Sequence, residues 1–197
     1  MKFDIVIAGV GGQGNVLASR VLARAALAAG LEVRTSESIG MAQREGQVAS
    51  HVRMGKGLAG AIIPYGEADL LIGLELAETV RALPRLRAGG KAVVSTTVIR
   101  PLSVLIGNSV YDDAGLLAYL KEQVPDVILL DAEELAVQAG NRKAANSILL
   151  GAVSTLDGFI PVSADHLLSA LLETLPPRLH EVNRRAFALG QQAVKKP

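Results

Sequence analysis

The chain has 197 residues, 50% of them hydrophobic and 3% aromatic, and its 20 basic and 19 acidic side chains give a net charge of +1. This balance argues against a nucleic-acid partner, and the absence of cysteine excludes disulfides, cysteine nucleophiles and cysteine-ligated iron–sulfur clusters. We expect a cytoplasmic protein without a signal peptide or membrane contact, because Asp4 interrupts the short apolar start and no uncharged run approaches the ~20 residues that a span needs.

Short β-branched runs between turn-forming residues predict strands, and Ala- and Leu-rich or amphipathic segments predict helices. In chain order, the expected elements are a strand at residues 3–8, a helix at 16–29, a strand at 31–35, a loop at 36–46, strands at 47–54, 59–63 and 69–74, a helix at 75–86, a strand at 91–95, a helix at 112–123, a strand at 127–130, and helices at 132–139, 142–156, 164–174 and 178–194.

Two features of this order indicate the fold class. The first strand, helix and strand have the ~35-residue size of a parallel crossover. Residues 47–54 and 59–63 are expected to form a β-hairpin through Gly55-Lys56-Gly57. The sequence therefore predicts an α/β fold with an open, mostly parallel Rossmann-like sheet flanked by helices, a β-hairpin insertion and a helical C-terminal region at about residues 131–197. We expect a single domain spanning residues 1–197.

A glycine-rich turn separates the first strand from the first helix. Its candidate cofactor-binding residues are Gly9, Gly11, Gly12, Gln13 and Gly14. In the pattern G-x-G-x-x-G, glycines allow a tight turn, close approach of a pyrophosphate and packing of the helix on the sheet. Glu37 lies roughly 20 residues beyond the turn, the spacing at which an acidic side chain binds a ribose. The turn thus predicts NAD or FAD binding, or else glycines that serve packing alone.

A second polar segment lies at residues 36–47. Its candidate binding residues, with two from the strand that follows, are Glu37, Gly40, Met41, Gln43, Arg44, Ser50 and Arg53. A loop beyond the carboxyl end of a strand lies over the crevice of an open α/β sheet. We expect Arg44 and Arg53 to support an anion there, with a solvent-exposed charge as the alternative for each. His51 is interpreted as a hydrogen-bonded sheet residue, and no grouping of His, Asp and Glu has metal-site spacing.

The motifs together resemble the gamma domain or subunit of the 2-oxoacid:ferredoxin oxidoreductases, nearest to the beta subunit of the indolepyruvate enzymes. The segments that carry the resemblance are residues 9–14, 36–46, 48–55, 62–69, 145–152 and 181–190. They cover nearly the whole chain. One departure is Glu45, where the family usually has glycine, so the usual conformation of that loop is in question.

The resemblance implies that a 2-oxoacid, with arylpyruvates preferred, is decarboxylated on thiamine diphosphate. It implies that electrons pass through iron–sulfur clusters to ferredoxin and that the acyl group goes to coenzyme A as co-substrate. Thiamine diphosphate, magnesium and the clusters are expected in a partner subunit, and the glycine turn and residues 36–47 would face that partner, the cofactor or coenzyme A. The chain alone is expected to be inactive, with no catalytic residue assigned. Asn146 and Asn183, in apolar helices, are expected to have structural roles.

Two interpretations of other classes stay open. One is a self-contained NAD- or FAD-dependent oxidoreductase, which would bind nicotinamide or flavin nucleotides without a partner. The other is a nucleotide-binding module that runs no reaction.

Overall fold

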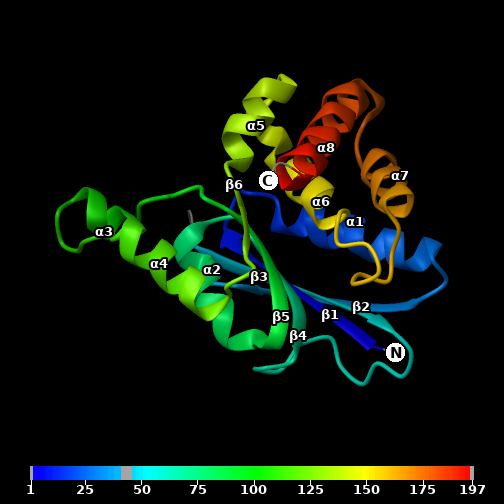
Figure 1. Cartoon of the computed structure of the whole chain (residues 1–197), viewed down its shortest axis with the longest axis horizontal. Coiled ribbons are helices and arrows are strands. Elements are labelled where there is room, and N and C mark those ends of the chain that lie inside the picture. The colour runs from blue at the N-terminus through cyan, green and yellow to red at the C-terminus, as the bar shows by residue number, and fades with distance from the viewer. Residues whose placement is uncertain (1, 41–45, 196–197) are drawn as a thin grey trace.

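The computed structural model describes residues 2–40 and 46–195, and a six-stranded sheet lies at its centre in the order β2-β3-β1-β4-β5-β6 (Figure 1). The strands are β1 (Lys2–Val10), β2 (Glu32–Ile39), β3 (Gln47–Gly55), β4 (Ala68–Gly73), β5 (Leu86–Ser95) and β6 (Ile128–Leu130). The helices are α1 (Asn15–Ala28), α2 (Leu76–Ala82), α3 (Leu102–Leu105), α4 (Asp113–Gln123), α5 (Ala132–Ala139), α6 (Ala145–Val153), α7 (Ala164–Thr174) and α8 (His180–Lys195). Three 3-10 turns are η1 (Leu83–Arg85), η2 (Arg142–Ala144) and η3 (Pro177–Leu179).

The directions of the strands confirm the mostly parallel α/β sheet. β1 pairs in parallel with β4, β4 with β5 and β5 with β6, whereas β3 runs antiparallel to both β1 and β2. β2 therefore points the same way as β1 but is separated from it by β3. The two strands of the predicted crossover, β1 and β2, are therefore parallel as expected, but they are not neighbours in the sheet.

The predicted hairpin is wrong. β3 forms its hairpin with β2, and β2 extends through residues 36–39, which were expected to be loop. Residues 59–63 form no strand. Arginine side chains donate to carbonyl groups in this region instead: Arg53 Nη1 donates to Gly60 O at 3.2 Å, and Arg34 Nε donates to Leu58 O, just before the segment, at 2.8 Å. Side chains therefore satisfy several backbone groups that strand pairing would otherwise satisfy.

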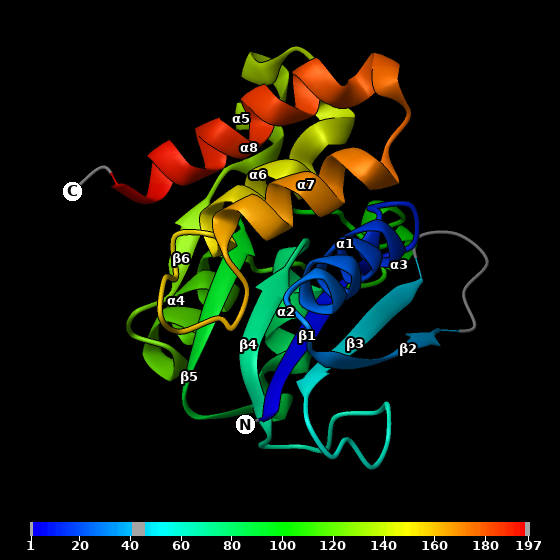
Figure 2. The ribbon, with the colours of Figure 1, turned by 90° about the vertical axis from the view of Figure 1, so that its right-hand side faces the viewer.

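Helices cover both faces of the sheet. α1, α5, α6, α7 and α8 lie on one face, and α2 and α4 lie on the other (Figures 1 and 2). Each face has its own hydrophobic core. Ile5 and Ile7 of β1 belong to the core under α1 and α5–α8, and Val6 and Ala8 belong to the core under α2 and α4. β1 is buried from Phe3 onward because a central strand of a parallel sheet is covered on both sides.

Local signals fixed some boundaries better than others. The helices expected at 132–139 and 164–174 have those bounds in the structure. The one expected at 142–156 begins with the turn η2 and continues as α6 only to Val153. The one expected at 75–86 ends at Ala82, because Pro84 follows within η1. α3 was not predicted.

α6 and α8 cross at very close range, which anchors the C-terminal helices. A Cβ on Gly151 would overlap the carbonyl of Phe187, and a Cβ on Gly190 would overlap the carbonyl of Ile148. Within the described residues, no helix has the length and apolarity needed to cross a membrane.

Candidate functional site

The connections of the sheet create a crevice between β1 and β4. The chain leaves the carboxyl end of β1 through α1 toward β2, and it leaves the carboxyl end of β4 through α2 toward β5, on the opposite side. Ligands of open α/β sheets bind where the connections diverge in this way. A cavity of about 580 Å³ opens there, lined by the glycine turn, the ends of β4 and β5, the start of α5, and η2 with α6.

The glycine turn takes a conformation that its sequence requires. Gly12 and Gly14 have φ of 91° and 85°, in the left-handed region that side chains rarely adopt. Gly9 serves close packing instead, because a Cβ there would lie 2.7 Å from Gln13 Oε1 and 2.9 Å from Leu74 Cβ. Of the predicted glycines of this turn, Gly12 and Gly14 line the crevice, and Gly9 and Gly11 do not.

The side chain of Gln13 ties this turn to the next strand. Val10 N donates to Gln13 Oε1 at 2.9 Å, and Gln13 Nε2 donates to Leu74 O at 2.9 Å. Gln13 therefore bridges the ends of β1 and β4 beneath the mouth of the crevice. Both ends of its amide are used by the backbone, so it shapes the wall of the site.

Asn146 of α6 reaches the same turn from the other side. Its Nδ2 donates to Gln13 O at 2.8 Å and to Gly14 O at 3.2 Å. The structural role expected for Asn146 agrees with these contacts. Its Oδ1 is buried at the crevice and has no hydrogen-bond partner among residues 2–40 and 46–195. A buried acceptor of this kind is costly to leave unpaired, so a donor from a ligand would be favoured there.

The start of α1 forms the positive end of the crevice. In the part of the chain that the structure describes, no side chain caps this helix and no acidic residue lies in its first turn. Its first N–H groups and its dipole therefore favour an anion by about 0.3–1 kcal/mol.

Two cations stand on the opposite wall, in η2. Arg142 is paired with Glu133 of α5. Lys143 also lines the cavity, and no described residue forms an ion pair with it. Asn141 begins this turn by accepting from Lys143 N at 3.0 Å. The arrangement suits an anionic ligand that also carries an N–H or O–H donor.

The predicted binding residues of the second segment and its strand fall into three groups: those near the glycine turn, those outside the described residues, and those elsewhere on the sheet. Gly11 N donates to Gly46 O at 2.8 Å, so the end of this segment does meet the turn. Gly40 lies just beyond β2 and pairs with Gln47 through the backbone. The residues Met41, Gln43, Arg44 and Glu45 lie outside the described residues.

Glu37 and Ser50 sit on the side of the sheet that α1 covers. Glu37 accepts a long hydrogen bond from Ser19 of α1 at 3.5 Å, two strands away from the turn because β3 intervenes. This placement argues against the ribose contact expected from dinucleotide folds. Ser50 is fully buried under α1, and its hydroxyl has no described partner. Neither side chain lines the crevice.

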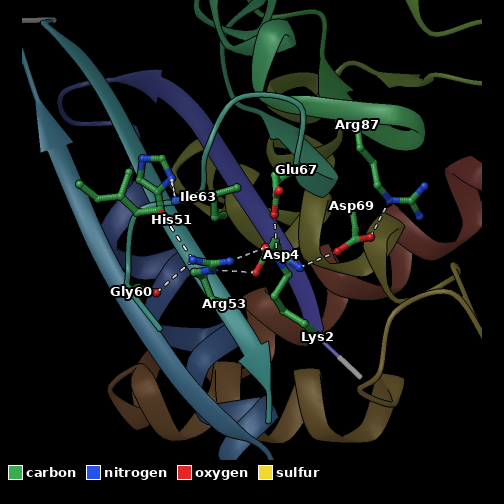
Figure 3. Close-up of polar contacts among 10 residues, drawn as sticks. Lys2, Asp4, His51, Arg53, Gly60, Ile63, Glu67, Asp69 and Arg87 are labelled. Carbon is green, nitrogen blue, oxygen red and sulfur yellow. Dashed lines mark hydrogen bonds and ion pairs between the residues drawn. The ribbon is translucent and has the colours of Figure 1, made fainter. Parts of the chain in front are cut away.

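Arg53 lies at the far end of the sheet. It pairs with Asp4, while Val10, at the turn, pairs with Gln47. Its Nε and Nη2 donate to Asp4 Oδ1 and Oδ2, each at 3.0 Å, in a buried bidentate ion pair (Figure 3). The structure does not bring Arg53 to the crevice, and it does not leave it on the exposed face of a strand either.

His51 lies beside this ion pair and is fully buried. Ile63 N donates to its Nδ1 at 3.3 Å (Figure 3). Burial, followed by the charges of Arg85 and Arg53, lowers the pKa of His51 from 6.5 to about 4. His51 is therefore the hydrogen-bonded sheet residue that we inferred from the sequence, and its lowered pKa keeps it neutral at pH 7. Among the residues described, no three His, Asp or Glu side chains form a metal-binding group.

Sequence reasoning missed the basic wall of the site. Arg142 and Lys143 lie about 130 residues after the glycine turn in the sequence. The available signal was their position soon after the strand at 127–130, because the loops that follow parallel strands meet at one edge of the sheet.

Comparison with known proteins identifies the family. A model described as pyruvate ferredoxin/flavodoxin oxidoreductase matches residues 4–193. The chain belongs to this family. Members that resemble it include the indolepyruvate oxidoreductase subunit IorB of Pyrococcus horikoshii, 38% identical over 98% of this chain and 96% of that one. The IorB subunit of Methanothermobacter thermautotrophicus is 37% identical over 96% of each chain.

Solved structures agree with this family assignment. The gamma subunit of a keto/oxoacid ferredoxin oxidoreductase from Geobacter sulfurreducens superposes with a TM-score of 0.69 at 26% identity, over 98% of both chains. A 2-oxoglutarate:ferredoxin oxidoreductase from Magnetococcus marinus, with coenzyme A and succinyl-CoA bound, gives a TM-score of 0.71 at 20% identity. This chain corresponds to 31% of that longer chain, and the likeness shows the shared fold.

Proposed function

We propose that this chain is one subunit of a 2-oxoacid:ferredoxin oxidoreductase that acts on indolepyruvate or another arylpyruvate, and that residues 1–197 are its gamma-type domain. Support for the family comes from the match over residues 4–193, and support for the substrate comes from the IorB relatives at 37–38% identity. The oxoacid is oxidised and decarboxylated, two electrons leave for ferredoxin, and the acyl group is transferred to coenzyme A.

In this proposal the chain's own task is to hold coenzyme A, and the crevice is the observation that carries it. Coenzyme A combines phosphate groups with amide and amino N–H donors. The phosphates suit the uncapped start of α1 and the unpaired Lys143, and an N–H donor suits the buried Oδ1 of Asn146. The cavity of about 580 Å³ lies within the range of small-molecule sites.

The remaining chemistry belongs to a partner subunit. Thiamine diphosphate, when bound there with magnesium, supplies the electron sink for decarboxylation. Iron–sulfur clusters require thiolate ligands, and this chain has no cysteine. Residues of the glycine turn, together with Gly40 and Gly46 from the later part of the segment at 36–47, are proposed to face coenzyme A or this partner. Within that arrangement Gln13 and Asn146 are positioning residues, because their amides fix the turn.

The test is a coenzyme A titration of the enzyme reconstituted with its partner. Arylpyruvate-dependent reduction of ferredoxin is measured for the wild type, Lys143→Ala and Lys121→Ala. Lys121 is a matched control, because it is an exposed lysine on α4, away from the cavity. One lost charge-assisted contact of about 1.5–3 kcal/mol raises KM for coenzyme A roughly 10- to 100-fold.

The oxoacid KM and the Lys121→Ala enzyme should stay unchanged. An unaltered coenzyme A KM in Lys143→Ala would refute the crevice as the site, and failure of every arylpyruvate would refute the substrate. Turnover by the chain without any partner would refute the proposal that thiamine diphosphate and the iron–sulfur clusters are bound by another subunit. The NAD, FAD and nucleotide-module alternatives predict heat on mixing the lone chain with these nucleotides in a calorimeter.

A further inference from the structure

β2 leaves one long edge of the sheet without a neighbour. It is the outermost strand, next to β3 (Figure 2), and no described strand pairs with its other side. Most of its residues are exposed, and Ile39 at its end is 70% exposed. Proteins normally protect such an edge, because its free N–H and C=O groups pair readily with another strand. β2 has the charged residues Glu32, Arg34 and Glu37, but it has no lysine or proline.

The neighbouring side of α1 continues this surface. Ser19 Oγ donates to Glu37 of β2, so the part of α1 just beyond Ser19 around the helix faces the open edge. At about 100° per residue, that side carries Val16, Arg20 and Leu27. Val16 is 39% exposed and Leu27 is 61% exposed, and Arg20 forms no ion pair with a described residue. Apolar groups and a free cation thus border the edge.

The sequence of β2 complements itself in one antiparallel register. When two copies are related by a two-fold axis perpendicular to the sheet, paired residues of the two β2 strands point to the same face. Side chains alternate between the faces along a strand, so the two paired residues are both even-numbered or both odd-numbered. If Ser36 faces Ser36 of the second copy, Val33 faces Ile39 and Thr35 faces Glu37. In this register the apolar residues Val33 and Ile39 face each other. In the register shifted by two residues, Val33 would instead face the charged Glu37.

α1 supports the same axis independently. The contact of Ser19 Oγ with the Glu37 carboxylate at 3.5 Å places these two residues at about the same level along β2, and a strand rises about 3.3 Å per residue against about 1.5 Å in a helix. Ser36 is then about level with Val21 of α1, which lies midway along the helix between Val16 and Leu27. A two-fold axis through Ser36 therefore brings Val16 to the level of Leu27 in the second copy and Arg20 toward its Glu37.

We propose that β2 and the Val16–Leu27 side of α1 form a two-fold interface with a second copy of this chain. The two sheets join into one continuous sheet through β2, and the exposed apolar side chains of each copy are covered by the other. The pairing of Arg20 with Glu37 across the axis adds charge complementarity. Val16, Arg20 and Leu27 do not line the crevice, so this interface does not depend on the proposed activity.

The absence of cysteine permits a direct test by disulfide cross-linking of the full chain. In Ser36→Cys, the two introduced thiols face each other with Cα atoms about 4.5–5.5 Å apart, within disulfide reach. In Thr35→Cys they are displaced diagonally by about 7–8 Å, and in Ser38→Cys by four residues, or about 13 Å. Mild oxidation should convert Ser36→Cys to a covalent dimer at least 10-fold faster than either control.

Sedimentation equilibrium of the unmodified chain should give twice its mass, and Ser36→Lys, which opposes two ammonium groups, should weaken self-association at least 10-fold. Ser36→Thr should remain dimeric, and far-UV circular dichroism should be unchanged in both. A monomeric wild type, or equal cross-linking at all three positions, would overturn the proposal. The cross-link should also form in the complex with the partner subunit; its loss there would assign this edge to the partner.

Discussion

The buried ion pair of Arg53 and Asp4 allows a sharp test of structural against ligand-binding roles. Asp4 is fully buried, and its two carboxylate oxygens accept from Arg53. Arg53→Met removes the cation and leaves Asp4 with the half-exposed ammonium of Lys2 at 3.1 Å. A buried charge that loses its partner costs about 3–5 kcal/mol, which is a large part of the ~5–15 kcal/mol that stabilises a domain.

Urea unfolding followed by far-UV circular dichroism measures this loss, since the chain has no tryptophan. The matched control is Arg87→Met, because Arg87 pairs with Asp69 at 2.7 Å but is 41% exposed. Its loss should be below about 1 kcal/mol. The double variant Asp4→Leu with Arg53→Met should recover most of the stability, because an apolar pair has no charge to desolvate.

Recovery should be incomplete, since Arg53 also donates to Gly60 O and Ile62 O. The KM for coenzyme A in the reconstituted complex should not change in Arg53→Met. A variant with wild-type stability and a raised KM would refute the structural role and restore Arg53 to the binding residues.

Two further predictions concern the same scaffold. The folded-state pKa of His51 is about 4 against 6.5 for a free histidine, so the stability from its neutral form is complete above pH 6.5 and is lost as the pH falls toward 4, by roughly 3 kcal/mol; His51→Gln should flatten this part of the urea-unfolding profile, and an unchanged acid limb would contradict it. Gly151→Ala should cost about 1–3 kcal/mol in the same assay, because its methyl meets the Phe187 backbone, whereas Gly60→Ala, with open space around it, should be near neutral; equal stabilities would contradict the close crossing of α6 and α8.

Helix positions were predictable where a local cap defines them. Asp112, Asp131 and Ser163 each accept from the backbone N–H three residues later, at the start of α4, α5 and α7. α5 and α7 begin at the predicted residue and α4 begins one residue later, since the signal lies within one turn. The strand pairing was less accessible, because alternation in residues 47–54 shows a strand but not its neighbours.

The candidate site was half predictable for the same reason. The glycine turn is contiguous in sequence, and its left-handed residues can only be glycine without strain. Lys143 and the contacts of Asn146 depend on how α6 packs against α1, a long-range consequence of the whole sheet. Arg53 was assigned to the site because nothing local to a strand tells which charge lies opposite it across the sheet.

The two ends of β1 differ in how completely their polar groups are satisfied. At the amino end, Asp4 is bound by Arg53 and Lys2, and its backbone N–H donates to Asp69 (Figure 3). At the carboxyl end, the start of α1 is uncapped and Asn146 Oδ1 is unpaired within the described residues. Other buried side-chain atoms also have no partner among the described residues, Ser50 Oγ and His51 Nε2 included, but of the residues with such atoms only Asn146 lines the crevice. Deficits of opposite kind, free donors on one wall and a free acceptor on the other, are the pattern expected of a site that a bound molecule completes.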